Sequence, residues 1–170
     1  MRVAIMALIL IVNFVLQTTL FQYIEILGVK PNTALIVIVS YGILRGDVEG
    51  AVLGFFSGFL TDVFFNGYIG LYAMLCMLIG YFCGKPFKDF YKENYFLPLS
   101  LAAASSLAYH FAIYFTGFLF RGKLDFSFYF RSIILPGSVY TLILTVPMYS
   151  LLYGVNKKLE DIEKTKRKLF

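Results

Sequence analysis

The stretch GILRGDVEGAVLGFFSGFLTDVFFNG, residues 42–67, decides the fold because it repeats glycine at every fourth position. A spacing of four places residues along one face of an α-helix, and the same spacing continues to Asp62 and Asn66. Glycine costs about 1 kcal/mol relative to alanine in a helix, so close packing must return more than that. Gly50, Gly54 and Gly58 predict a groove without side chains, against which another helix packs, whereas the first two glycines flank a turn. The five glycines of the repeat are Gly42, Gly46, Gly50, Gly54 and Gly58.

The composition of the whole chain is that of a membrane protein. Its 170 residues are 59% hydrophobic and 15% charged, with a mean hydropathy of +0.77, whereas soluble domains are about 25% charged. A helix needs about 20 apolar residues to cross a hydrocarbon core of about 30 Å. Runs near this length fill most of the chain, so we expect an all-α integral membrane protein without a sizeable soluble domain.

Charged breaks divide the chain into six candidate transmembrane spans. We expect a compact helical bundle over residues 1–155 and a short basic cytoplasmic tail over residues 156–170. The second span is short for a full crossing, although Pro31 suits the first turn of a helix. The expected spans are Val3 to Tyr23, Pro31 to Leu44, Val48 to Phe65, Tyr68 to Gly84, Tyr95 to Phe120 and Ile133 to Gly154.

Lysine and arginine are distributed unevenly between the two sides of such a bundle. If the N-terminus is cytoplasmic, the outer side carries only Lys30, Arg121, Lys123 and Arg131, and all other basic residues lie inside. The positive-inside rule therefore predicts that both termini are cytoplasmic. The net charge of +5 then indicates attraction to anionic lipids, at about 1 kcal/mol per basic residue. Nucleic-acid binding is not expected, because the basic residues lie in short loops beside the membrane and a short tail.

The sequence RGDVEG, residues 45–50, predicts a tight cytoplasmic turn between the second and third spans. Arg45 is expected at the negative C-terminal end of one helix, and Asp47 at the positive N-terminal end of the next, with Gly46 between them. A role in the turn and a role in binding a partner are equally open for Arg45, Asp47 and Glu49.

Asp62 lies on the glycine face, about 22 Å along the helix from Asp47, so it is expected toward the outer side of the membrane. A carboxylate costs about 3 kcal/mol at the bilayer centre and therefore needs a partner. A structural role and a partner-facing role are both open. The predicted helix-packing or partner groove is Gly50, Gly54, Gly58 and Asp62. The candidate polar partners of Asp62 are Asn13, Gln17, Asn66 and His110, or a partner subunit.

Catalytic and metal-binding patterns have no positive support. His110 is the only histidine, so no histidine-based metal set can form from this chain alone. Cys76 and Cys83 lie seven residues apart in one span and are expected to be small buried thiols. Nucleophile-elbow, phosphate-loop and metalloprotease motifs are absent. We expect no cofactor and no enzymatic activity, the remaining catalytic alternative being an intramembrane enzyme built on His110 and Asp62.

The stretch from Lys30 to Leu75 resembles the signature region of the MreD family of bacterial rod-shape-determining membrane proteins. The C-terminal PGSVYTLILTVPMY, residues 136–149, is similar too. At Thr141, where that family often has asparagine, this sequence differs. The matching positions are Pro31, Asn32, Arg45, Gly46, Gly50, Gly54, Phe55, Gly58, Asp62, Gly70, Pro136 and Pro147.

This resemblance implies a non-enzymatic, multi-pass scaffold subunit of the cell-wall elongation complex, which makes peptidoglycan, in the bacterial cytoplasmic membrane. Such proteins pair with the single-span protein MreC and link the actin-like MreB to a RodA-type glycosyltransferase and a class B penicillin-binding protein. The resemblance also implies a fold similar to the substrate-binding subunits of energy-coupling-factor vitamin transporters. The alternative function is therefore such a transporter subunit. Those subunits typically carry small residues four apart on the first helix, whereas here Ala4 and Ala7 are three apart.

Overall fold

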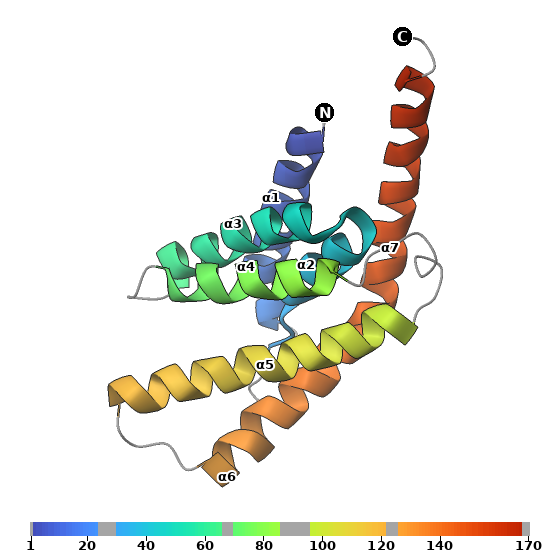
Figure 1. The fold of residues 1–170 in the computed structure, drawn as a ribbon. Helices are drawn as coiled ribbons and strands as arrows, with labels where there is room; N and C mark the ends of the chain where they lie inside the picture. Colours follow the sequence, from blue (N-terminus) through green and yellow to red (C-terminus); the bar gives the residue numbers. More distant parts are fainter. Residues whose placement is uncertain (1, 24–29, 66–69, 86–95, 122–125, 168–170) are drawn as a thin grey trace.

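The computed structural model describes residues 2–23, 30–65, 70–85, 96–121 and 126–167 (Figure 1). All regular secondary structure within these ranges is helical, which confirms the predicted all-α class for the described part of the chain. The helices are α1 Arg2–Tyr23, α2 Thr33–Arg45, α3 Asp47–Phe65, α4 Leu71–Gly84, α5 Phe96–Arg121, α6 Phe126–Tyr129 and α7 Leu135–Arg167, with a π-helical segment, Phe130–Ile134, between α6 and α7.

The central helix is α2, in which every residue from Thr33 to Leu44 is buried. It contacts α1, α3, α4, α5 and α7, which explains why its sequence is apolar all round rather than on one face. The helix begins two residues after Pro31, because the Asn32 side chain accepts a hydrogen bond of 3.1 Å from the N–H of Leu35 and caps it. Its 13 residues extend about 20 Å, which is shorter than a full crossing.

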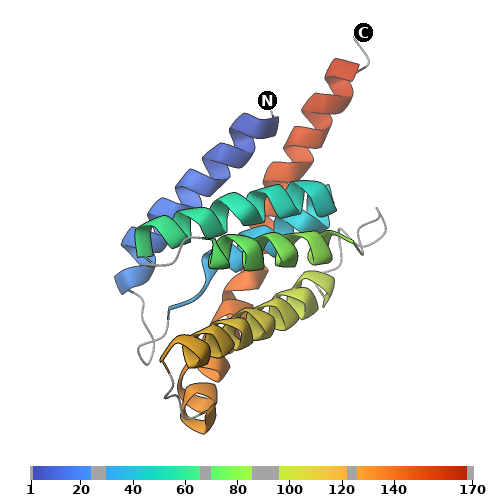
Figure 2. The same ribbon diagram turned by 60° about the vertical axis from the view of Figure 1, so that its left-hand side comes forward.

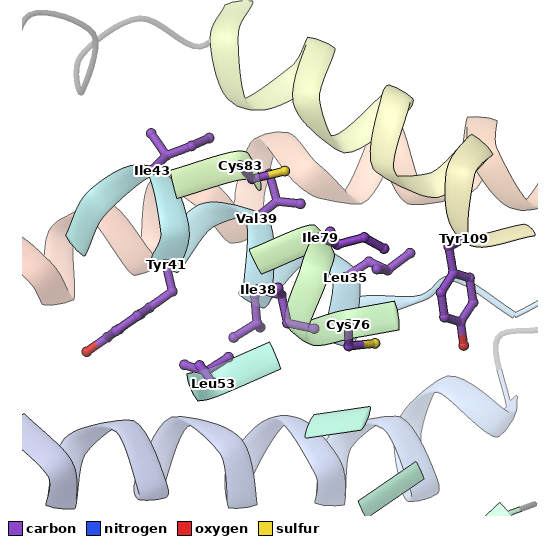
Figure 3. Close-up of a cluster of buried hydrophobic side chains, with 11 residues drawn as sticks. Leu35, Ile38, Val39, Tyr41, Ile43, Leu53, Cys76, Ile79, Cys83 and Tyr109 are labelled. Carbon is purple, nitrogen blue, oxygen red and sulfur yellow. The ribbon is translucent and has the colours of Figure 1, made fainter. Parts of the chain in front are cut away.

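The hydrophobic core lies where α2 meets α3, α4 and α5 (Figure 3). Leu35 and Ile38 of α2 belong to the same buried cluster as Leu53 of α3, Ile79 of α4 and Tyr109 of α5. Because α2 supplies buried side chains in several directions, the other helices are organised around it rather than around a flat interface.

The helices around this core run in more than one direction. Figures 1 and 2 show α3 and α4 side by side and α5 running across α7. Both views place the start of α1 and the end of α7 at the same end of the molecule.

Two helical stretches are each long and apolar enough to cross a membrane, Phe96–Thr116 and Phe126–Ile162. Shorter apolar helices cover Ile5–Thr19, Thr33–Arg45 and Leu71–Gly84. The 19 residues of α3 include three acidic residues, two of them in its first turn. The helices therefore differ widely in length and in how much apolar surface they offer to lipid.

The last helical segment is longer than predicted at both ends. Helical structure already begins at Phe126 instead of Ile133, and α7 continues past Gly154 to Arg167 without a break. Pro136 has no N–H to donate to the carbonyl four residues earlier. The N–H of Leu135 instead donates to the carbonyl of Phe130, five residues earlier, and this widened turn keeps the helix continuous.

Candidate functional site

The predicted groove of α3 lies directly against the backbone of α4. A methyl group placed on Gly54 would lie 2.2 Å from the carbonyl oxygen of Cys76, and one on Gly58 would lie 2.3 Å from that of Tyr72. Such contacts are essentially never shorter than 3.0 Å, so neither position has room for a side chain. We call Gly50, Gly54 and Gly58 the glycine stripe.

The end of the stripe nearest the α2–α3 turn meets two helices at once. A methyl group on Gly50 would lie 2.7 Å from the carbonyl oxygen of Gly80 and 2.8 Å from the Cα atom of Gly42. Gly42 belongs to α2 and Gly80 to α4, so three helix backbones converge there. The early Gly50 of α3 faces Gly80 near the end of α4, and the later Gly58 faces Tyr72 at the start of α4, so the two helices are antiparallel.

The second half of this contact is a four-residue repeat on α4 that the sequence analysis missed. A methyl group on Gly80 would lie 2.1 Å from the carbonyl oxygen of Gly50, and one on Gly84 would lie 2.4 Å from the Cα atom of Asp47. Only two members of the repeat are glycines, although their spacing of four was a visible signal. The repeat is Tyr72, Cys76, Gly80 and Gly84, of which Tyr72 and Cys76 contribute backbone atoms to the contact.

The predicted turn residues lie between α2 and α3. Gly46 has a φ of 106°, a conformation that favours glycine. Its N–H donates a 2.8 Å hydrogen bond to the carbonyl of Gly42 and so closes the end of α2. The Asp47 side chain accepts a 2.9 Å hydrogen bond from the N–H of Val48 in the first turn of α3. The turn brings α3 back beside α2, which places the glycine stripe.

Arg45, at the end of α2, contacts the far end of the chain. Its Nε donates a hydrogen bond to Oδ1 of Asn156 on α7. The Nδ2 of Asn156 donates in turn to Oε1 of Glu160, at 3.0 Å. Asn156 is buried although its helical neighbours Val155 and Lys157 are exposed. This contact fixes α7 against the α2–α3 turn.

The carboxylate of Asp62 caps the first turn of α4. Oδ2 accepts hydrogen bonds from the N–H groups of Gly70 at 2.9 Å and Ala73 at 3.1 Å, and Oδ1 accepts one from Tyr72 at 3.3 Å. These donors are among the groups at a helix start that have no partner inside the helix, and the helix dipole favours a negative charge there. Asp62 is fully buried, at 0% exposure. The hydrogen bonds from backbone N–H groups compensate its carboxylate for the loss of water.

Among the described residues, Asp62 makes no hydrogen bond to the side chains that were predicted as its partners. The hydrogen bonds of its carboxylate go to the backbone of α4, and none goes to Asn13, Gln17 or His110. Asn13 is buried on α1 and its Oδ1 has no hydrogen-bond partner among the described residues, while Gln17 is partly buried. Asn66 lies outside the described residues. Backbone donors from the following helix take the place of the side chains that we expected.

His110 takes part instead in a polar contact between α5 and α7. Its Nδ1–H donates a 2.7 Å hydrogen bond to the carbonyl of Ser106, one turn earlier. The hydroxyl of Ser106 donates to that of Ser138 on α7, at 3.2 Å. Nearby on α7, the hydroxyl of Thr141 donates to the carbonyl of Gly137 at 2.7 Å and accepts from the N–H of Asn32 at 3.4 Å. Thr141 thus keeps a polar contact with the start of α2.

Both cysteines are buried free thiols. The Sγ of Cys83 lies 3.2 Å from the hydroxyl oxygen of Ser105 on α5, within hydrogen-bond distance. Among the described residues, no group of three or more histidine, cysteine, aspartate or glutamate side chains could hold a metal ion. What the structure brings together at the predicted site is a contact between helices.

Comparison with protein families decides the identity of the chain, because residues 1–158 match the family described as rod shape-determining protein MreD. The chain belongs to the MreD family. It is therefore a membrane protein of the system that determines rod shape in bacteria. The members of this family are shape-determining structural proteins, and the family is not known as one of enzymes. Comparison with curated proteins and with solved structures finds no match. The match to MreD covers α1 to α5 entirely and α7 as far as Lys158.

Proposed function

We propose that this MreD-family chain is a non-enzymatic scaffold subunit of the bacterial cell-wall elongation complex, and that it pairs with MreC. The observation that carries the proposal is the family match over residues 1–158. Through MreC it would connect MreB in the cytoplasm with a RodA-type glycosyltransferase and a class B penicillin-binding protein. Its contribution to peptidoglycan synthesis is to hold these partners in place in the membrane.

In this proposal, the glycine stripe and Asp62 make contacts between α3 and α4 of the same chain and do not contact a partner protein. The backbone of α4 already fills the groove at Gly54 and Gly58, so a partner helix cannot enter it without displacing α4. The carboxylate of Asp62 is likewise occupied by the N–H groups that begin α4. These residues therefore fix the shape of the α3–α4 pair, and the partner contacts lie on the outer surfaces that this shape determines.

We further propose a multi-pass arrangement of about six spans in the cytoplasmic membrane, with both termini inside. The start of α1 and the end of α7 lie at the same end of the molecule, as an even number of crossings requires (Figures 1 and 2). The excess of basic residues in the loops and tail assigned to that side supports a cytoplasmic location and contact with anionic lipids.

Affinity purification of the tagged full-length chain from its native membrane tests the proposal. We expect an MreC-like single-span protein to be recovered together with cell-wall synthesis enzymes. An unrelated multi-pass protein with the same tag, expressed at the same level, provides the control for non-specific recovery. Recovery of ATPase subunits with a bound vitamin would overturn the proposal in favour of the substrate-binding subunit of an energy-coupling-factor transporter.

A further inference from the structure

An open cavity lies at the end of the molecule away from both termini. It has a volume of about 420 Å³, and its walls are Ser127, Phe128, Arg131 and Ser132. Figures 1 and 2 show α6 at this end of the molecule, and the start of α1 and the end of α7 at the other. With both termini in the cytoplasm, as proposed above, the cavity lies on the outer side of the membrane.

This cavity offers a positive charge together with hydroxyl groups. The Arg131 side chain is exposed, and no acidic side chain among the described residues forms an ion pair with it. Ser127 and Ser132 add a hydroxyl group each to the same walls. A guanidinium group presents its N–H donors in a planar fork that matches the oxygens of a phosphate group, and a hydroxyl group can donate to a further oxygen. The cavity therefore suits a phosphate group.

Aromatic rings next to the cavity mark the level of the membrane surface. The ring centroid of Tyr114 on α5 lies 5.3 Å from that of Phe126 and 5.3 Å from that of Tyr129. The ring of Phe126 also contacts that of Phe130, at 5.8 Å. Tyrosine is enriched where a membrane meets water. Arg131 follows Tyr129 by two residues, so its charge lies at the depth of the lipid headgroups.

A second cavity follows along the same helix, toward the middle of the membrane. It has a volume of about 190 Å³ and is lined by Pro136, Val139, Tyr140 and Ile143. Its first residue comes four positions after Ser132 of the outer cavity, and residues four apart lie on one face of a helix. The two cavities therefore follow one another along one face. We call them together the outer groove.

The length and polarity of the outer groove match one leaflet of a membrane. The twelve residues from Arg131 to Ile143 extend about 18 Å. One leaflet contributes ~15 Å of hydrocarbon, half of a core of ~30 Å. Val139 is 52% exposed and Ile143 is 65% exposed, so the lower part of the groove is apolar and open to lipid. Its charged part lies at the headgroups and its apolar part among the acyl chains.

We propose that the outer groove binds one phospholipid molecule of the outer leaflet, with its phosphate group on Arg131 and an acyl chain along Val139 and Ile143. A phospholipid carries its phosphate and its chain in this order and at these depths. A transmembrane helix in the same groove would have to place an acidic side chain at the level of Arg131. The assignment to the outer leaflet rests on the topology proposed above.

Lipid binding by the full-length chain in a mild detergent tests the site. Native mass spectrometry measures the retention of dioleoyl phosphatidylethanolamine, which has no net charge and is therefore not drawn to the basic tail. Dioleoylglycerol, with the same chains but no phosphate, is the comparison lipid. We expect the phospholipid to bind preferentially, and Arg131→Gln to lower its apparent affinity about tenfold, as loss of a hydrogen bond to a charged group predicts.

The matched control for the charge is Lys157→Gln. It removes one positive charge from an exposed position near the other end of the molecule, and we expect it to bind the phospholipid as the wild type does. Val139→Trp tests the apolar part, because the larger side chain fills the second cavity without changing the charge. We expect this variant to lose most of the bound lipid while its unfolding temperature in detergent stays at the wild-type value.

Four outcomes would overturn the site. Equal retention of the two lipids would remove the role of the phosphate, and equal losses with Arg131→Gln and Lys157→Gln would remove that of Arg131. Displacement of the lipid by excess inorganic phosphate would indicate an anion site that holds no acyl chain. Loss of the MreC-like protein from Arg131→Gln, with lipid retention unchanged, would indicate that a partner helix covers the groove instead.

Labelling of Ser127→Cys tests the leaflet separately. A maleimide that does not cross membranes is added to right-side-out membrane vesicles, and the parent chain, whose two cysteines are buried, gives the background. We expect Ser127→Cys to be labelled from outside. Labelling only after permeabilisation would overturn the outer-leaflet assignment and the proposed topology together. Failed lipid selectivity with labelling from outside would overturn the site alone and leave the proposed function standing.

Discussion

Two helix contacts in this molecule are built in opposite ways. Between α3 and α4, side chains are missing where the helices meet, and Gly54 lies against the backbone of Cys76. Between α5 and α7, the contact contains side-chain hydrogen bonds such as that from Ser106 to Ser138. Both solve the same problem, because lipid tails are as apolar as leucine and give helices no hydrophobic reason to associate.

The difference shows which kind of contact tolerates change. A glycine contact depends on backbone atoms, which cannot move aside, so any added side chain must separate the helices. A hydroxyl contact depends on the ends of side chains, which can rearrange or find other partners. We therefore expect substitutions at the α3–α4 contact to be far more costly than substitutions at the α5–α7 contact.

The largest effect is expected for Gly54→Leu. Even a methyl group there would lie 2.2 Å from the carbonyl oxygen of Cys76, so we expect a loss of at least the ~3 kcal/mol at the upper end of overpacking costs. Thermal unfolding in detergent measures it. The matched control is Gly154→Leu, since a Cβ atom at Gly154 has no other atom within 4 Å. Similar destabilisation by both variants would remove the special role of the glycine stripe.

A smaller effect is expected at Asp62, which joins the same two helices through hydrogen bonds. Asp62→Leu leaves three N–H groups at the start of α4, including that of its N-cap Gly70, without an acceptor, at a cost of about 2 kcal/mol or more. Asp62→Asn keeps one acceptor oxygen, and we expect about half that loss. Unfolding of the two variants side by side measures the ratio. Equal losses would mean that the charge matters at the helix start, rather than the number of acceptors.

The smallest effect is expected at the contact between α5 and α7. Hydrogen bonds between membrane helices average about 0.6 kcal/mol in double-mutant cycles. We expect a coupling of this size between Ser106→Ala and Ser138→Ala, measured from the unfolding of both single variants and the double variant. A coupling as large as the loss caused by Gly54→Leu would reverse the comparison between the two contacts.

The sequence was sufficient to find the glycine stripe because spacing alone defines it. Its neighbour α4 was harder to identify, since Tyr72 and Cys76 are not small enough to stand out as members of a packing repeat. They belong to the contact through their backbone atoms. Because these atoms are the same in every residue, the residue types do not indicate the contact. Only Gly80 and Gly84 gave a signal.

Asp62 illustrates a second limit. Its place on the glycine face followed from the four-residue spacing, but its partners did not. Polar side chains were the expected partners, whereas the donors are N–H groups at the start of α4, which every residue except proline carries. The length of α7 was also missed, because the charged residues that were taken as the end of the last span do not end the helix, which continues to Arg167.

The short second span was predicted in place but not in role. Its uniform apolar sequence fits a helix that crosses lipid and equally one that is enclosed by other helices. The structure shows the enclosed case, with every residue from Thr33 to Leu44 buried. A sequence gives the apolar character of each position, while the number of neighbouring helices follows from the fold.

One purification connects the α3–α4 contact with the proposed scaffold role. The tagged wild type, Gly54→Leu and Gly154→Leu are expressed to equal levels in the native membrane, and the MreC-like protein recovered with each is quantified. We predict that recovery is lost with Gly54→Leu and stays at the wild-type level with Gly154→Leu. Full recovery with Gly54→Leu would contradict the account, because assembly with the partner would then not depend on the helix pair that the glycines hold together.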